Sequence, residues 1–208
     1  MGVKIISIEG NIGSGKTTLF EKLKKDICDP NVVFLREPVD IWNHITNKEN
    51  ENILTKYYNN QEKYAFAFQT LILQTRSQLF QDIMRNPNIK LIICERSIQA
   101  DKDIFAKMLY NDGKMDDIMF STYKYFYNQI TFPLSGVMYI NTDAFECKNR
   151  VIIRNRKGET IPLSYLKKCE AYYEDWIQYH DHISISSNYE LEKVQIFQYI
   201  QQVLNGVY

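Results

Sequence analysis

The sequence predicts an α/β domain in which a parallel sheet is flanked by helices. Short apolar runs alternate with longer segments of helical periodicity along the chain, a pattern typical of this fold class. The runs are rich in Val and Ile and apolar on both faces, as buried parallel strands are. A glycine-rich segment directly follows the first run, where phosphate-binding loops join a strand to a helix.

Five runs have the length and composition of buried strands. They are Val3–Ile8, Val32–Leu35, Lys90–Cys94, Gly136–Ile140 and Ile183–Ser186. Parallel strands need crossover connections, so helices are expected between them. The predicted helices are Leu19–Ile27, Leu54–Met84 with a break near Asn59 and Asn60, Gln99–Tyr110, Asp116–Gln129, Asp143–Arg154, Pro162–His180 and Glu190–Leu204. Because no repeat or Pro/Gly linker divides the 208 residues, we interpret residues 1–208 as a single domain.

Composition excludes several classes of partner. Twenty-five Lys and Arg balance 25 Asp and Glu, so no overall field favours nucleic acid or a membrane surface, and an anion site must be local. No apolar run approaches the roughly 20 residues of a membrane span. The strand-like start at Val3 leaves no room for a signal peptide, although a longer precursor stays open. The four scattered cysteines, Cys28, Cys94, Cys147 and Cys169, lack zinc spacing and are interpreted as reduced thiols of a cytoplasmic protein.

The glycine-rich segment matches the phosphate-loop motif G-x-x-x-x-G-K-[S/T] from Gly10 to Thr17. Its backbone N–H groups and the following helix N-terminus would hold phosphates. Lys16 is expected to reach the β- and γ-phosphates of ATP, and Thr17 to offer its hydroxyl to Mg²⁺. The loop is assigned Gly10, Asn11, Ile12, Gly13, Ser14, Gly15, Lys16, Thr17 and Thr18. This motif alone does not separate a kinase from a GTPase-like switch, a motor or a binding module.

Two predicted strands end in acids. Glu37 follows the second strand, and Glu95 and Arg96 follow the third. The carboxyl ends of parallel strands meet at one edge of the sheet, where ligands collect. We therefore assign Glu37 as general base, Glu95 to the metal shell, and Arg96 to neutralise charge on the transferred phosphoryl group. For either acid alone, a solvated strand end is an equal alternative.

The phosphate loop and four motifs along the chain resemble the deoxynucleoside kinase family, from the phosphate loop to about Trp176. The motifs are Glu37-Pro38-Val39 with Trp42, Phe68-Gln69-Thr70, Glu95-Arg96-Ser97 with Asp101, and Arg150-x-x-x-Arg154-x-Arg156. The resemblance implies a P-loop kinase fold with strand order 2-3-1-4-5 and a homodimer. It also implies ATP with Mg²⁺ as phosphate donor and a deoxynucleoside as acceptor.

The family's site residues can be matched to this sequence. Glu37 would be the catalytic base, Gln69 would pair with the edge of the nucleobase, and Phe68 and Phe105 would form aromatic walls. Tyr58 would read the sugar 3′-hydroxyl. Ile12, Trp42 and Leu54 would complete the pocket, and Ile72, which fills a position that is small in the deoxycytidine enzyme, would narrow it. Plain core packing is the alternative for each aromatic residue taken alone.

A basic segment at about 150–160 resembles the family's mobile lid. Arg150 and Arg154 lie four residues apart and so share a helix face, and Arg156 and Lys157 follow. The lid would close on ATP phosphates and exclude water, whereas a solvated face is the alternative. The family carries two adjacent acids after the lid, but this chain has only Glu159, whose sugar-reading role is therefore open in register.

Base preference depends on Arg76 and Asp101. Arg76 lies seven residues after Gln69, on the same helix face, and Asp101 opens the next helical segment. In the family, an Arg and an Asp at these places mark the deoxycytidine and deoxyguanosine kinase branch. An ion pair between them would fill the space that thymidine's methyl group needs. We therefore expect a deoxycytidine or purine deoxynucleoside kinase. A deoxynucleoside monophosphate kinase and a non-catalytic nucleotide-binding homologue are the alternatives.

Overall fold

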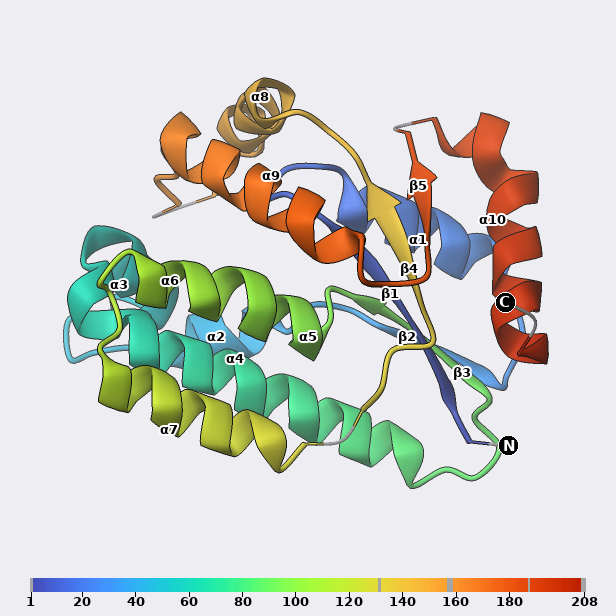
Figure 1. Cartoon of the computed structure of the whole chain (residues 1–208), viewed down its shortest axis with the longest axis horizontal. Coiled ribbons are helices and arrows are strands. Elements are labelled where there is room, and N and C mark those ends of the chain that lie inside the picture. The colour runs from blue at the N-terminus through green and yellow to red at the C-terminus, as the bar shows by residue number, and fades with distance from the viewer. Residues whose placement is uncertain (1, 131, 157–158, 187, 207–208) are drawn as a thin grey trace.

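A computed structural model describes residues 2–130, 132–156, 159–186 and 188–206 of the chain. Within them, five parallel strands form one sheet in the order β2-β3-β1-β4-β5 (Figure 1). The strands are β1 (Lys4–Gly10), β2 (Val32–Leu35), β3 (Leu91–Glu95), β4 (Gly136–Ile140) and β5 (His182–Ile185). Sheet order and strand direction confirm the prediction.

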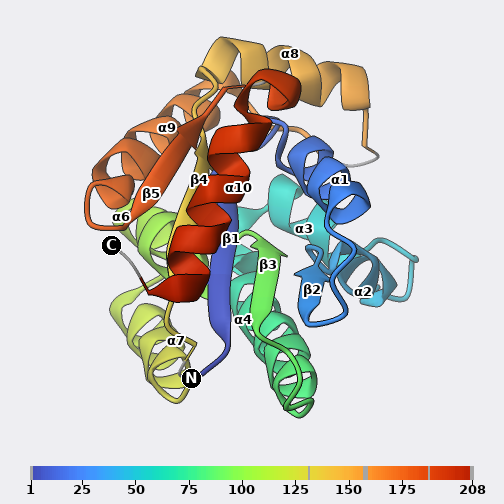
Figure 2. The same cartoon turned by 90° about the vertical axis from the view of Figure 1, so that its right-hand side faces the viewer.

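Helices cover both faces of the sheet (Figures 1 and 2). On one face, α1 (Lys16–Asp26) and α10 (Tyr189–Asn205) pack against Ile6 and Ile93. On the other, α4 (Gln61–Met84) and α7 (Asp117–Asn128) pack against Ile5 and Ile92, and α9 (Leu163–Ile177) packs beside them against β4. Neighbouring residues of each strand therefore enter different cores, which explains why the strands are apolar on both faces.

The remaining helices follow the predicted pattern with two differences. They are α2 (Val39–His44), α3 (Ile53–Asn59), α5 (Ile98–Ala100), the π-helix η1 (Asp101–Ala106), α6 (Lys107–Asn111) and α8 (Ala144–Arg154). The predicted break falls at Asn60, whose side chain caps α4 by accepting a 3.1 Å hydrogen bond from the Lys63 N–H. The six-residue α2 escapes prediction because it is too short to establish a helical period.

The second difference is the π-helical middle of the helix that the sequence predicts over Gln99–Tyr110. π-Helical turns occur mostly at functional sites, and this one carries Asp101 and Phe105, which both line the cavity described below. Among the described residues, no helix is long and apolar enough to cross a membrane.

Candidate active site

A cavity of about 320 Å³ lies beyond the carboxyl ends of β1, β2 and β3, a size that suits a small ligand. Every residue predicted to bind the nucleoside lines it except Arg76. All the residues assigned to the phosphate loop also line the cavity, apart from Gly10, Asn11 and Ser14. The fold therefore brings residues from position 12 to position 165 around one space. The sequence missed three lining residues, Val39, Tyr57 and Tyr165.

The phosphate loop depends on glycines where neighbouring elements approach it. At Gly10, φ is +144° and an added Cβ would lie 2.7 Å from the carbonyl oxygen of Ile140. At Gly13, φ is +86° and a Cβ would lie 2.6 Å from the carbonyl oxygen of Cys147. Only glycine combines this backbone conformation with such close approach. The end of β4 and helix α8 thus pack so closely against the loop that only glycine fits at these two positions.

Lys16 is held inside the loop that it serves. Its Nζ donates hydrogen bonds to the carbonyl oxygens of Gly10 (3.1 Å) and Asn11 (2.7 Å). Burial and the neighbouring Arg96 lower the pKa of Lys16 to about 8, although nearby carboxylates oppose the shift. A phosphate bound in the loop would therefore favour the charged form of Lys16.

Thr17 and Glu95 meet at the mouth of the loop. The Thr17 hydroxyl donates a 2.5 Å hydrogen bond to Oε1 of Glu95. Both are hard oxygen donors of the kind that Mg²⁺ prefers. Among the described residues, no group of three or more His, Cys, Asp or Glu side chains is arranged to hold a metal ion. The pair therefore fits Mg²⁺ only as a partial shell that substrate phosphates would complete.

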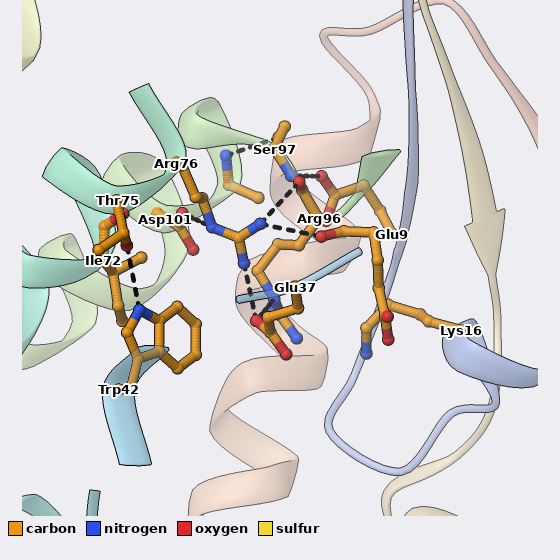
Figure 3. A network of polar contacts seen from close by, with 12 residues as sticks. Glu9, Lys16, Glu37, Trp42, Ile72, Thr75, Arg76, Arg96, Ser97 and Asp101 are labelled. Carbon is orange, nitrogen blue, oxygen red and sulfur yellow. Dashed lines mark hydrogen bonds and ion pairs between the residues drawn. The ribbon is translucent and has the colours of Figure 1, made fainter. Parts of the chain in front are cut away.

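Glu37 is surrounded by cations. Nη2 of Arg76 lies 2.7 Å from Oε1 of Glu37, and Nε of Arg96 lies 3.6 Å from the same oxygen (Figure 3). Burial by itself would raise the pKa of Glu37, but Arg76, Arg96 and Lys16 outweigh it and hold the pKa below its usual value. Glu37 is therefore a carboxylate at neutral pH and can accept a proton.

The predicted ion pair between Arg76 and Asp101 is present, with Nε 2.7 Å from Oδ2 (Figure 3). Arg76 is only 2% exposed and lies behind the cavity wall. Because Arg76 is not among the residues that line the cavity, its predicted contact with substrate stays a prediction. Asp101 is the member of the pair that lines the cavity. Burial raises the pKa of Asp101 to about 6, against the effect of Arg76 and Arg96.

The other end of the cavity is aromatic. Phe68 packs edge-on against Trp42, with ring centroids 5.6 Å apart, and lies 4.7 Å from the ring of Tyr57. Gln69, the next residue, is buried, and its Oε1 has no hydrogen-bond partner among the described residues. An unpaired buried acceptor is costly. A ligand N–H would satisfy it, as the role predicted for Gln69 requires.

Sequence reasoning missed the support behind Arg96. Nη1 of Arg96 donates a 2.6 Å hydrogen bond to the hydroxyl of Tyr173, and that hydroxyl donates to Oε2 of Glu9 at 3.1 Å. Oε1 of Glu9 accepts from the N–H of Ser97 at 2.7 Å (Figure 3). Glu9 ends the first strand and could have been found by the rule applied to Glu37 and Glu95. Tyr173 carried no such signal.

Arg96 also has a strained backbone, with φ at +66°. Non-glycine residues adopt this region rarely and mostly where function requires it. Its guanidinium carbon lies 4.3 Å from the ring centroid of Phe105, a cation–π distance. The turn thus directs the Arg96 side chain across the cavity, between the aromatic wall and Glu37.

The lid residues carry paired charges. Nη2 of Arg154 lies 2.7 Å from both carboxylate oxygens of Glu159, and Nε of Arg150 lies 2.8 Å from Oε1 of Glu146. Glu159 therefore pairs with Arg154 of the lid and also lines the cavity. Neither contact tests the predicted sugar-reading role of Glu159, which stays a prediction. Lys157, predicted to belong to the basic cluster, lies outside the described residues.

The sheet order, the phosphate loop and the cationic cavity define a P-loop kinase fold. The chain belongs to the deoxynucleoside kinase family, whose model matches residues 6–205. This match confirms the resemblance inferred from the motifs.

Named relatives agree with the family. Deoxycytidine kinase of Rattus norvegicus is 30% identical over 218 residues, covering 93% of this chain and 82% of its own length. A fowlpox virus (strain NVSL) protein named "Probable deoxycytidine kinase" is 32% identical, covering 84% of this chain and 72% of its own length. Deoxycytidine kinase 1 of Xenopus laevis is 29% identical, with coverages of 93% and 80%.

Proposed function

We propose that this chain transfers the γ-phosphate of ATP to the 5′-hydroxyl of a deoxynucleoside, with deoxycytidine or purine deoxynucleosides preferred over thymidine. The observation that carries the proposal is a single cavity that joins the phosphate loop to an aromatic pocket containing Gln69 and Asp101. Glu37, an ionised acid, lines the same cavity. A donor phosphate and an acceptor hydroxyl could therefore meet beside a base.

In the proposed reaction, Glu37 accepts the proton of the 5′-hydroxyl as that oxygen forms a bond to the γ-phosphorus. The bond between the γ-phosphorus and its bridging oxygen breaks, and ADP leaves with the electron pair. Lys16 and Arg96 neutralise charge on the phosphoryl oxygens, and Arg150 and Arg154 would do so from the lid. The low pKa of Glu37 keeps it ready to accept the proton at neutral pH.

Mg²⁺ would be held by Thr17 and Glu95 together with phosphate oxygens. When bound, it neutralises charge on the β- and γ-oxygens. The protein would contribute two oxygen donors, which are in contact with each other. Glu95 is buried, and a cation nearby would offset the cost of burying its charge.

The proposed base preference rests on Asp101 in the cavity wall. Its carboxylate offers hydrogen-bond acceptors that suit an amino-substituted base edge. The ion pair with Arg76 fixes its position, so space for a 5-methyl group cannot be made by simple rotation of the side chain. The deoxycytidine kinases among the relatives are consistent with this preference.

We further propose a cytoplasmic homodimer. The four cysteines are free, which suits a reducing compartment. Ile118, Tyr125 and Phe126 on α7 are exposed, and burying them against a second copy would remove apolar surface from water. Light scattering after gel filtration tests the dimer, and an Ile118→Glu substitution is expected to shift it towards monomer.

A phosphorylation panel tests the function. ATP and Mg²⁺ are combined with deoxycytidine, deoxyadenosine, deoxyguanosine, thymidine and deoxycytidine monophosphate, beside a Glu37→Gln variant. Turnover of deoxycytidine or a purine deoxynucleoside above thymidine, lost in the variant, is the expected result. Thymidine as best substrate would remove the base preference, and phosphorylation of the monophosphate alone would identify a monophosphate kinase. ATP binding without turnover would favour a non-catalytic homologue.

A further inference from the structure

Arg76 connects three parts of the site through one guanidinium. Nη2 contacts Oε1 of Glu37, which follows β2, and Nε contacts Oδ2 of Asp101 in η1, each at 2.7 Å. Nη1 donates to the carbonyl oxygens of Glu95 (2.9 Å) and Arg96 (3.2 Å) at the end of β3. Figure 3 shows the planar group lying between the two carboxylates. Every guanidinium nitrogen of Arg76 thus faces a site element.

These contacts leave the guanidinium little freedom. Arg76 is among the largest fully buried side chains of the described residues, at 2% exposure. The two carbonyl contacts fix its plane relative to β3, and the planar fork then fixes where each carboxylate can bind. A displacement of either carboxylate would leave a buried charge unpaired, which costs several kcal/mol in general. The positions of Glu37 and Asp101 are therefore coupled.

We propose that Arg76 is a positioning residue for phosphoryl transfer: it orients Glu37 from behind the cavity wall while it holds Asp101 towards the nucleobase. This inference rests on the proposed function and deepens it, because one cation serves both base recognition and the proton acceptor. Arg76 acts through Glu37 and touches no substrate. Its removal is expected to change proton transfer as well as base preference.

Other charged groups also face Glu37. They are Arg96 after β3, Lys16 in the phosphate loop, Arg156 in the lid, Tyr58 in α3 and, across Arg76, Asp101 in η1. Arg96 lies farther from Glu37 than Arg76 does, at 3.6 Å. Glu37 and Asp101 also act on each other, and the negative charge of Asp101 opposes the ionisation of Glu37. Losing Asp101 and losing Arg76 should therefore have opposite effects on the pKa of Glu37, although both break the same ion pair.

That difference gives the experiment its control. Arg76→Met removes the positive charge beside Glu37. Asp101→Asn removes the negative charge of the second ion-pair partner of Arg76, with little change in side-chain shape. The ionisation of Glu37 is followed by carboxyl-carbon NMR in the substrate-free protein, with Glu37→Gln assigning the signal. The acidic limb of the kcat/KM profile against pH is measured for each variant with its best nucleoside. Thermal unfolding checks that both variants fold.

In Arg76→Met we expect the Glu37 titration and the acidic limb to move upward by about one pH unit or more, the usual effect of removing an adjacent opposite charge. In Asp101→Asn neither should move upward, because a nearby negative charge is lost while Arg76 remains. An upward shift of similar size in both variants, or no upward shift in Arg76→Met, would overturn the proposal. If wild type phosphorylates no nucleoside, the proposed function fails, and the NMR titration still decides whether Arg76 controls Glu37.

Discussion

The hydroxyl of Thr17 lies 2.5 Å from Oε1 of Glu95, across 78 residues of chain. The first follows the lysine of the phosphate loop, and the second ends the neighbouring strand β3, which pairs with β1 in parallel register. Parallel pairing brings the two strand ends to one edge of the sheet. The contact is therefore a direct consequence of strand order, and it supplies two of the oxygen donors of the proposed Mg²⁺ site.

Removing the Thr17 hydroxyl is expected to weaken Mg²⁺ use. In Thr17→Ala the Mg²⁺ concentration for half-maximal activity should rise by about tenfold or more, in line with losses seen when metal-shell groups are removed. Activity is measured against Mg²⁺ at constant ATP. Thr17→Ser keeps the hydroxyl and serves as control. Equal Mg²⁺ requirements in Ala and Ser variants would exclude Thr17 from the metal shell.

ATP affinity should depend on pH through Lys16. Burial and Arg96 lower its pKa to about 8, and bound phosphates would raise it because they favour the charged form. Below pH 8 the lysine is charged in both states, so affinity should be flat. Above pH 8 binding takes up a proton, and affinity should fall by up to about tenfold per pH unit.

Calorimetry in two buffers of different ionisation enthalpy measures this proton uptake. Lys24→Met, which removes an exposed lysine of the same helix, should keep the effect, whereas Lys16→Met should lose it. An affinity that stays constant from pH 8 to 9.5 in wild type would contradict the coupling.

Two buried tyrosines should respond differently to loss of their hydroxyls. Tyr173 bridges Arg96 and Glu9, so Tyr173→Phe leaves buried charged groups short of a partner and should cost about 1–3 kcal/mol of unfolding free energy. It should also lower kcat, since Arg96 loses support. The hydroxyl of Tyr123 has no hydrogen-bond partner among the described residues, so Tyr123→Phe should be neutral or stabilising. Urea unfolding of both variants gives the comparison, and similar costs would refute it.

The base preference can be tested by enlarging the pocket. Replacing Arg76 and Asp101 together with Met and Ala removes both charges and avoids leaving either one unpaired. The ratio of thymidine kcat/KM to deoxycytidine kcat/KM should rise by about tenfold or more, the scale on which pockets discriminate a methyl group. Taking the ratio within one protein cancels the effect that losing Arg76 is expected to have on Glu37. A ratio that does not increase would refute the steric account.

Much of the site could be predicted because its residues sit at ends of regular elements. Strand ends gave Glu37, Glu95 and Arg96, and the loop motif gave Lys16 and Thr17. The same rule, applied to the first strand, would have yielded Glu9. The role of Tyr173 could not be predicted from the sequence, because Tyr173 lies 77 residues from Arg96 and 164 residues from Glu9 along the chain. Neither the aromatic residue nor its helix differs from an ordinary core element.

The sequence by itself determined the class of fold and the phosphate loop, because hydrophobic period and glycine spacing are local properties of the chain. The resemblance to the family also led to the prediction that Arg76 and Asp101 would pair. Only the tertiary structure decided that Arg76 lies behind the wall and binds Glu37 as well. That outcome depends on how α4 lies against the ends of β2 and β3, where the carboxylates and carbonyl oxygens around Arg76 stabilise its buried charge.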